Sequence, residues 1–323
     1  MALAGCGRGQ PEPVRTILFA MDTAIDLTVY GERAEEAVRQ AGVEVRRLEG
    51  LFSVTLAESD VARINAADGE PLLVSPETAE ILGLALALWA ETEGAFSPGL
   101  YALQRTWGFT TDHRRVPEDE EIATLLGQVD VGSIQIEGLH VTVPAGTQLD
   151  FGAIAKGYAG DRLTEILDEL SIDGAILSFG GDVLAFGARP GGEPWRVAIR
   201  SPLGDGFLGL VEVRDRMVST SGSYERQFTA EDGQVYHHIL DPETGRPAQS
   251  GLVSVSVVSE MGARGDALAT ALFVMGLDAG AAFVARSQDL EAIFVTEDGR
   301  VYASAGLEGV FLPADGLVVN WRL

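Results

Sequence analysis

Residues 149–157 read LDFGAIAKG, and this stretch marks the passage from an extended segment into a helix. The residues before it, Val141–Leu149, are expected to be extended. Gly152 permits a sharp turn because it has no side chain. The helix is expected to begin near Ala153. The stretch therefore predicts an extended chain that turns abruptly and places the residues after Gly152 in the first turn of a helix.

Lys156, in that first turn, is the only lysine of the chain, beside 22 arginines. Lysine offers a compact charge with three donors, which suits a phosphate group, whereas arginine offers a planar fork. A cation is mildly unfavourable near a helix N-terminus, and a bound anion would remove that penalty. Two readings stay open: Lys156 binds an anion, or Asp150 caps the helix and Lys156 is solvated.

Outward from this stretch, helices and strands mix without strict alternation, which favours an α+β fold with two intimately packed lobes of mixed sheet and helices. Periodicity and capping signals predict helices first and mainly strands later, with a glycine- and aromatic-rich loop at 93–109. Helices are expected at 32–52, 59–65, 75–92, 117–126, 153–170 and 266–277, and strands at 23–30, 133–136, 140–143, 174–179 and repeatedly from 195 onward.

Composition excludes several classes of partner. The net charge of −25 argues against binding a nucleic-acid backbone or docking electrostatically on anionic lipid. An anionic substrate would need a local positive site or a bound cation. The longest apolar candidate, Ile81–Ala90, is too short for the ~18–20 residues of a membrane span.

Residues 1–15 are expected to form an N-terminal tether, and residues 16–323 the main domain. Leu3–Cys6 resembles a bacterial lipobox, in which the cysteine is acylated; otherwise Cys6 is a plain tail thiol. Only five residues precede Cys6, fewer than the ~7–15 apolar residues of a signal sequence. Because the chain has one cysteine, it has no internal disulfide and no cysteine-based zinc site is expected.

Two further clusters carry candidate chemistry. Asp266 and Thr270 are four residues apart and share one helical face, where hard oxygen donors suit Mg²⁺; the alternative is an aspartate N-cap followed by an ordinary threonine. His238 lies beside a predicted turn at Asp241–Gly245, and it is a general base, a metal ligand or a strand residue. Zinc is disfavoured because no third soft ligand is nearby.

Taken in order, these segments resemble the ApbE family of flavin transferases, from Met21 to about Gly276. The motifs that carry the resemblance are Met21–Thr23, Ser59–Asn65, Gly94–Pro98, Trp107–Phe109, Asp150–Gly157, Gly180–Asp182, Thr220–Tyr224, His238–Gly245 and Asp266–Thr270.

The resemblance implies a Mg²⁺-dependent enzyme that uses FAD as substrate. It would attach FMN through a phosphoester to a threonine or serine of an acceptor flavoprotein and release AMP. It also implies roles for individual residues. FAD contacts would come from Asp150, Lys156, Met21, Phe52, Ala95, Phe96, Ser97 and Leu240, metal ligands from the Ala153 carbonyl, Asp266 and Thr270, and the catalytic groups would be His238 and Lys156.

Departures from the family pattern occur at a few positions. Asp22 stands where glycine is usual, Ser97 where aspartate is common and Gly99 where threonine is common. Phe52 replaces a frequent tyrosine. Two other functions stay open: a Mg²⁺-dependent FAD pyrophosphatase that yields FMN and AMP, and a non-enzymatic FAD-binding lipoprotein. The resemblance places the chain in a bacterial cell envelope, lipid-anchored through Cys6 on the outer face of the cytoplasmic membrane.

Overall fold

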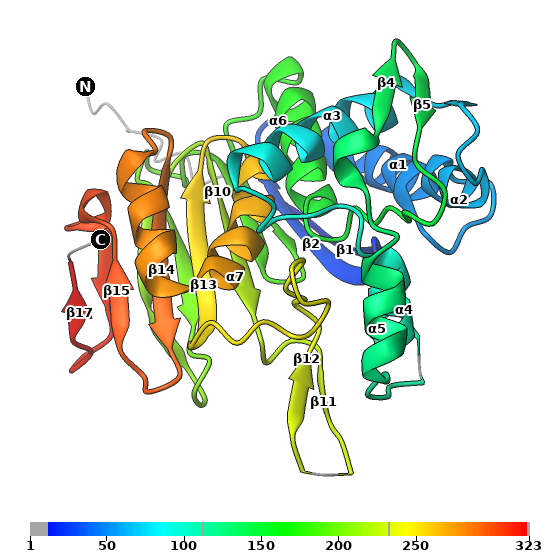
Figure 1. Ribbon diagram of the computed structural model, residues 1–323. Coiled ribbons are helices and arrows are strands. Elements are labelled where there is room, and N and C mark those ends of the chain that lie inside the picture. Colours follow the sequence, from blue (N-terminus) through cyan, green and yellow to red (C-terminus); the bar gives the residue numbers. More distant parts are fainter. Residues whose placement is uncertain (1–11, 112, 232, 322–323) are drawn as a thin grey trace, which may run out of the picture.

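The computed structural model describes residues 12–111, 113–231 and 233–321, and in them nine strands form one large sheet (Figure 1). The strand order is β1-β2-β6-β7-β10-β13-β14-β15-β17, with antiparallel pairs except for the parallel pair β15–β17. The strands of this sheet are β1 (Val14–Ala20), β2 (Thr23–Tyr30), β6 (Gly174–Phe179), β7 (Asp182–Gly187), β10 (Arg216–Gly222), β13 (Leu252–Ser259), β14 (Leu290–Thr296), β15 (Val301–Ala303) and β17 (Val319–Asn320).

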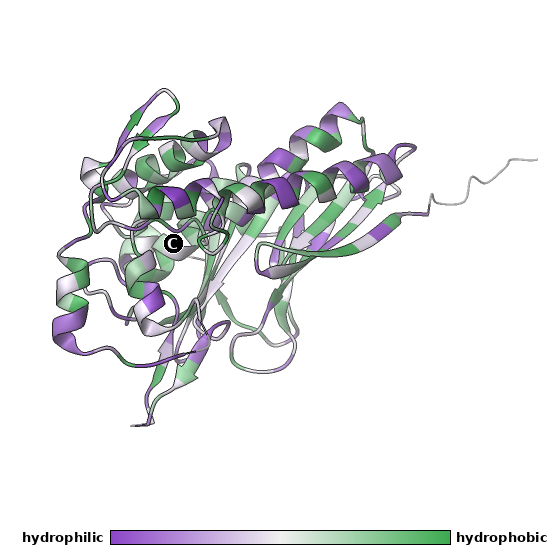
Figure 2. Ribbon diagram, turned by 90° about the vertical axis from the view of Figure 1, so that its right-hand side faces the viewer, coloured by the Kyte–Doolittle hydropathy of each residue, from purple (hydrophilic) through white to green (hydrophobic). Residues whose placement is uncertain are grey.

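Helices cover one face of this sheet. The main ones are α1 (Ala34–Phe52), α3 (Pro76–Glu91), α6 (Ala155–Glu169) and α7 (Gly262–Arg286). α1 buries Ala37, Ala41, Val45 and Leu48, a spacing of three and four residues that places them on one helical face toward the core. Figure 2 shows the helical layer lying over the sheet, with the hydrophobic colouring concentrated in the strands.

A small sheet covers part of the other face. It consists of β8 (Trp195–Arg200), β9 (Phe207–Val213) and β16 (Phe311–Pro313), in the order β16-β9-β8. In β8, buried Trp195, Val197 and Ile199 alternate with exposed residues and form a second hydrophobic core with the large sheet. The α+β fold is confirmed, and the two expected lobes share the nine-stranded sheet between a helical layer and a sheet layer.

The remaining elements lie at the edge of the helical layer. They are α2 (Asp60–Ala66), α4 (Tyr101–Trp107), α5 (Asp119–Leu126), a sheet of β3 (Leu72–Leu73), β5 (His140–Thr142) and β4 (Gln135–Glu137), the hairpin β11 (Gln227–Thr229)–β12 (Val235–His237), and a 3-10 turn at Val131–Ser133. A second 3-10 turn, Ala305–Leu307, contacts β14 and belongs to the second hydrophobic core. The hairpin projects from the body of the molecule (Figure 1). A third hydrophobic cluster joins α4, α5 and Leu240.

Four predicted elements need correction. The loop expected at 93–109 contains α4, and α6 begins at Ala155 rather than Ala153. Of the extended segment predicted at 141–149, only the part within β5 is a strand. α7 spans Gly262–Arg286 rather than 266–277, and Gly276 breaks its helical backbone with a φ of 78°.

α7 is also more apolar than the sequence analysis recognised. By length and composition it is apolar enough to cross a membrane, with a mean hydropathy of 1.8 over 18 residues. However, it packs on β10, β13 and α6. Four of its residues are completely buried: Ala267, Leu268, Ala271 and Phe273. Its hydrophobicity is therefore that of a core helix.

Candidate functional site

The candidate site is centred on the crossing of α6 and α7. Gly157 lies so close to α7 that a methyl group on it would stand 2.1 Å from the carbonyl oxygen of Gly262. The two carboxylate oxygens of Asp161 accept hydrogen bonds from the backbone amides of Gly262 and Ala263, at 2.5 and 2.8 Å. Glycine at the contact and Asp161 one turn later therefore fix the start of α7 against α6.

Lys156 lies at this crossing between two buried carboxylates. Its Nζ is 2.6 Å from Oδ2 of Asp182 and 3.2 Å from Oδ1 of Asp266. The other oxygen of Asp182 accepts a hydrogen bond from the Thr220 amide, and the other oxygen of Asp266 accepts one from the Gly157 amide. The reading in which Lys156 is solvated is wrong. Three residues distant in the sequence form one ionic cluster.

This cluster carries an excess of negative charge. Burial by itself lowers the pKa of Lys156, but Asp182 and Asp266 outweigh it and raise that pKa, so the side chain stays an ammonium. Burial raises the pKa of Asp266 to about 6, although Lys156 works in the opposite direction. One ammonium between two carboxylates leaves the cluster with a net negative charge, which a bound cation would neutralise.

The predicted metal ligands lie on α7 and just before the start of α6. Thr270 Oγ1 lies 2.9 Å from Ser221 Oγ, one turn along α7 from Asp266. The Gly157 amide donates to Asp266 and not to Ala153, so in the described part of the chain no hydrogen bond ends on the Ala153 carbonyl. A free carbonyl, a hydroxyl and a carboxylate are donors that fit Mg²⁺, which usually keeps several waters as well.

Side chains of the usual metal-binding types would not form this metal site by themselves. Among the described residues, no group of three or more histidine, cysteine, aspartate or glutamate side chains could hold a metal ion. A metal here would therefore depend on the carbonyl, the hydroxyl and water besides one carboxylate. The reading of Asp266 as an N-cap is wrong, because α7 begins at Gly262 and its N-cap is Met261.

His238 follows β12 directly and is held by the backbone of Arg226. Its amide donates to the Arg226 carbonyl at 3.0 Å, and its ring Nδ1 lies 3.2 Å from the same oxygen. Because a carbonyl only accepts, Nδ1 carries the proton and Nε2 is left with its lone pair. Burial, then Arg226, His237 and Lys156, lower the pKa of His238 to about 4, so the ring is neutral at pH 7.

Asp150 lies beside Arg226 at the N-terminal side of α6. Its Oδ1 accepts a hydrogen bond from the Gly152 amide at 2.8 Å, and no side chain caps α6, so the predicted capping role of Asp150 is wrong. Burial raises the pKa of Asp150, while the Gly152 amide and the Arg226 charge lower it. Arg226 also forms an ion pair with Asp22, at 2.7 Å.

The other predicted flavin contacts lie in three places. Phe52, Phe96 and Leu240 are only 5%, 2% and 4% exposed, so they belong to the core. Met21 is half-buried in the turn between β1 and β2, and its amide donates to Glu49 at 2.8 Å.

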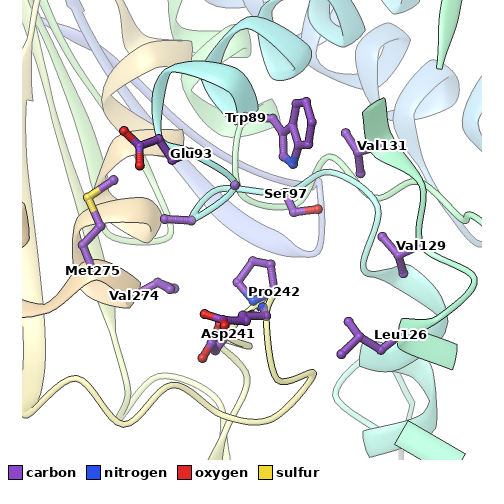
Figure 3. Close-up of a pocket in the computed structure, with 13 residues that line it drawn as sticks. Trp89, Glu93, Ser97, Leu126, Val129, Val131, Asp241, Pro242, Val274 and Met275 are labelled. Carbon is purple, nitrogen blue, oxygen red and sulfur yellow. Dashed lines mark hydrogen bonds between the residues drawn. The ribbon is translucent and has the colours of Figure 1, made fainter. Parts of the chain in front are cut away.

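Ala95 and Ser97 line a cavity of about 580 Å³ near the start of α4. Figure 3 shows the Trp89 side chain on one side of it and Pro242 opposite, with Val274 and Met275 from α7 on another wall. This size falls within the usual range for small-molecule pockets. The full lining is Trp89, Glu93, Gly94, Ala95, Ser97, Leu126, Val129, Val131, Asp241, Pro242, Glu243, Val274 and Met275.

Sequence reasoning missed three residues of the site as functional groups. Asp182 had one local signal, since it follows two glycines at a strand end, where the backbone makes room for a neighbour. Asp161 and Arg226 had none, because their partners lie 101 and 204 residues away. Such contacts follow from the packing of α6 on α7 and of the hairpin on the β1–β2 turn.

Comparisons with known proteins identify the family of this chain. The model of the ApbE family matches residues 21–294. The chain is 34% identical to the FAD:protein FMN transferase of Treponema pallidum, over 93% of this chain and 89% of that protein. It is also 34% identical to the enzyme of the same description from Vibrio cholerae, over 95% of each chain.

Solved structures show the same fold. A crystal structure of the ApbE protein of Thermotoga maritima superposes with a TM-score of 0.87 at 32% identity, covering 93% of this chain and 99% of that one. The flavinyl transferase ApbE of Pseudomonas stutzeri, in its apo form, gives 0.84 at 29% identity, covering 94% and 98%.

Proposed function

This chain belongs to the ApbE family, and on that premise we propose that it is an FAD:protein FMN transferase. The enzyme would take FMN from FAD, attach it through a phosphoester to a threonine or serine of an acceptor protein, and release AMP. The new bond joins the acceptor oxygen to the FMN phosphorus, and the bond broken joins that phosphorus to the bridging oxygen, which leaves with AMP.

The observation that carries this proposal is the cluster of Lys156, Asp182 and Asp266 at the crossing of α6 and α7. A diphosphate is repelled by a protein with a net charge of −25 unless local cations meet it. The ammonium of Lys156 is fixed by two carboxylates, so its position is set before substrate arrives. A preorganised cation of this kind stabilises charge that develops during phosphoryl transfer.

Asp266, Thr270 and the Ala153 carbonyl are the residues that would hold Mg²⁺. Bound there, Mg²⁺ would neutralise charge on the phosphoryl oxygens and the leaving group. The excess negative charge of the cluster and the unused Ala153 carbonyl support this assignment. Lys156 would hold the phosphate, and Asp182 would keep Lys156 in place.

His238 would act as the base that takes the proton of the acceptor hydroxyl. Its Nδ1 proton is engaged by the Arg226 carbonyl, so Nε2 is the atom that accepts. The low pKa of about 4 keeps Nε2 unprotonated at neutral pH. The same low pKa limits its strength as a base, so transfer would depend on the hydroxyl being brought close.

We also propose that the enzyme works in a bacterial cell envelope, anchored through a lipid on Cys6. That residue lies outside the described part of the chain, and the support is the lipobox-like Leu3–Cys6 alone. Radiolabelled fatty acid supplied to cells should label the wild-type protein and not Cys6→Ser.

The proposed function is tested by mass spectrometry of an acceptor domain after incubation with FAD, MgCl₂ and this protein. An increase by the mass of bound FMN, localised to a threonine or serine, is expected together with free AMP. Release of FMN and AMP without labelling would favour an FAD pyrophosphatase. Binding of FAD with no AMP would favour a non-enzymatic flavin carrier.

A further inference from the structure

We propose that Arg226 is a second cation for the diphosphate of FAD, and that Asp22 competes with the substrate for it. This inference rests on the proposed function. It concerns two residues that the sequence analysis gave no role in substrate binding, one in the turn between β1 and β2 and one just before β11.

The ion pair joins two segments at an open surface. Met21 and Asp22 form a two-residue turn with φ values of 53° and 58°, between the paired residues Ala20 and Thr23. This turn presents the Asp22 side chain outward, and it is 84% exposed. The Arg226 side chain, 47% exposed, reaches across to it at 2.7 Å.

Arg226 lies at the reacting end of the site. Its carbonyl oxygen holds both the amide and the ring Nδ1 of His238. Its charge reaches Asp150 and His238, and the charge of Lys156 reaches His238 as well. The charges of Arg226 and Lys156 therefore act on the same histidine from two separate segments.

Charge favours an exchange of partners. Besides Asp161, which the α7 amides engage, the described site holds the carboxylates of Asp22, Asp150, Asp182 and Asp266 against the cations Lys156 and Arg226. Lys156 is occupied by two buried carboxylates, whereas Arg226 is bound to one exposed carboxylate. An exposed ion pair contributes little to stability. Arg226 donates one hydrogen bond to Asp22, whereas a diphosphate carries more negative charge and can accept from both arms of the planar guanidinium.

Space is available beside the pair. A cavity of about 490 Å³ lies against the turn and is lined by Phe19, Ala20, Asp22, Thr23, Ala24 and Glu49. The Asp22 end of the ion pair therefore faces an opening and not packed core. Among the described residues, the guanidinium of Arg226 donates its one side-chain hydrogen bond to Asp22.

The test is a cycle of three variants, Arg226→Ala, Asp22→Gly and the double variant. Glycine is suitable at position 22 because the turn has a positive φ. The measured quantity is the dissociation constant for FAD in the presence of MgCl₂, from quenching of flavin fluorescence. Riboflavin, which has the flavin ring without phosphate, is the second ligand.

We expect Arg226→Ala to weaken FAD binding by roughly 10-fold or more, the scale of a lost hydrogen bond to a charged group. Asp22→Gly should tighten FAD binding several-fold, and it should have no effect once Arg226 is absent. Arg226→Lys should keep part of the affinity. Riboflavin binding should stay the same in every variant.

Arg196→Ala serves as the matched control. Arg196 lies on β8, away from the site, is 48% exposed and pairs with Glu212 of β9 at 2.9 Å. Its loss should leave FAD affinity unchanged. The fold of each variant is checked by circular dichroism, and Asp22→Gly keeps the test decisive if Arg226→Ala fails to fold.

Unchanged FAD affinity in Arg226→Ala would overturn the inference, and so would an equal loss for FAD and riboflavin, which would mean that the pair only fastens the hairpin. Tightening by Asp22→Gly that persists without Arg226 would also overturn it. Each of these results leaves the proposed function intact if the wild type still transfers FMN. If the wild type bound no FAD, both this inference and the proposed function would be wrong.

Discussion

Lys156 contacts two carboxylates that are almost fully buried, so its ammonium is a counter-charge for the protein, and in the proposed function it would bind the substrate as well. Removing it leaves Asp182 and Asp266 facing each other without compensation. Arginine has the same charge, but its fork is larger and planar, and it would not fit between two oxygens fixed for a compact ammonium.

Lys156→Ala should therefore lower the rate of FMN transfer by on the order of 10²–10³, the scale for a lost charge-stabilising group. Lys156→Arg should restore little of it. Initial rates of acceptor labelling at saturating FAD and MgCl₂ give the comparison. Near-normal rates in either variant would contradict the phosphate role of Lys156.

The lowered pKa of His238 predicts how the stability of the protein depends on pH. Its pKa is lowered from 6.5 to about 4, so the ring should stay neutral throughout the range in which an exposed histidine becomes charged. Because folding lowers this pKa, the unfolded chain binds the proton more tightly. His238 should therefore reduce stability only as pH falls below about 6.5, with a penalty that grows until about 4.

The ring protons of the four histidines can be followed by NMR titration, with His238 assigned from its absence in His238→Gln. The expected midpoint for His238 is near 4. A midpoint between 6 and 7, as for a solvated imidazole, would show that the burial described for this ring is wrong in solution.

At the scale of elements, the sequence predicted what is decided locally. α1, α3 and the strand β6 were predicted to within two residues, because their periodicity and caps lie within the element. α4 was missed, because its Leu103 and Trp107 are buried by distant segments: the Trp107 indole donates to the carbonyl of Gly245. The contact of Asp182 with Lys156 was likewise invisible, since it needs the packing of β7 beside α6.

The crossing of α6 and α7 should be sensitive to a single methyl group. Gly157→Ala would place a carbon 2.1 Å from the Gly262 carbonyl and force the helices apart. It should lower the free energy of unfolding by about 1–3 kcal/mol, the usual cost of overpacking. Transfer activity should fall as well, because Asp266 would move away from Lys156.

Gly83→Ala in α3 is the control, since a methyl group there meets no atom within 4 Å. Alanine favours helix over glycine, so Gly83→Ala should be neutral or stabilising by about 0.5–1 kcal/mol. Urea unfolding of both variants measures the two changes in the free energy of unfolding. Equal stabilities for the two would show that α6 and α7 do not cross as closely as described.

At the scale of the whole molecule, 48 acidic residues against 23 basic ones make the folded protein repel itself. Salt should therefore raise its melting temperature by screening this repulsion, and the rise should be the same for every cation at equal ionic strength. A divalent ion that binds at Asp266 acts differently, because it binds the folded state alone and stabilises it by mass action. The two effects separate when solutions of equal ionic strength are compared.

We expect MgCl₂ to raise the melting temperature above that in KCl of the same ionic strength, and Asp266→Ala to remove the excess while keeping the response to KCl. Asp298→Ala is the control: Asp298 is exposed in the turn between β14 and β15, where it pairs with Arg300 at 3.0 Å, so its loss should leave the Mg²⁺ excess in place. Differential scanning fluorimetry measures all three proteins. If Mg²⁺ stabilised Asp266→Ala as much as the wild type, the cation would bind elsewhere on this acidic surface, and the carboxylate at the helix crossing would have no part in holding it.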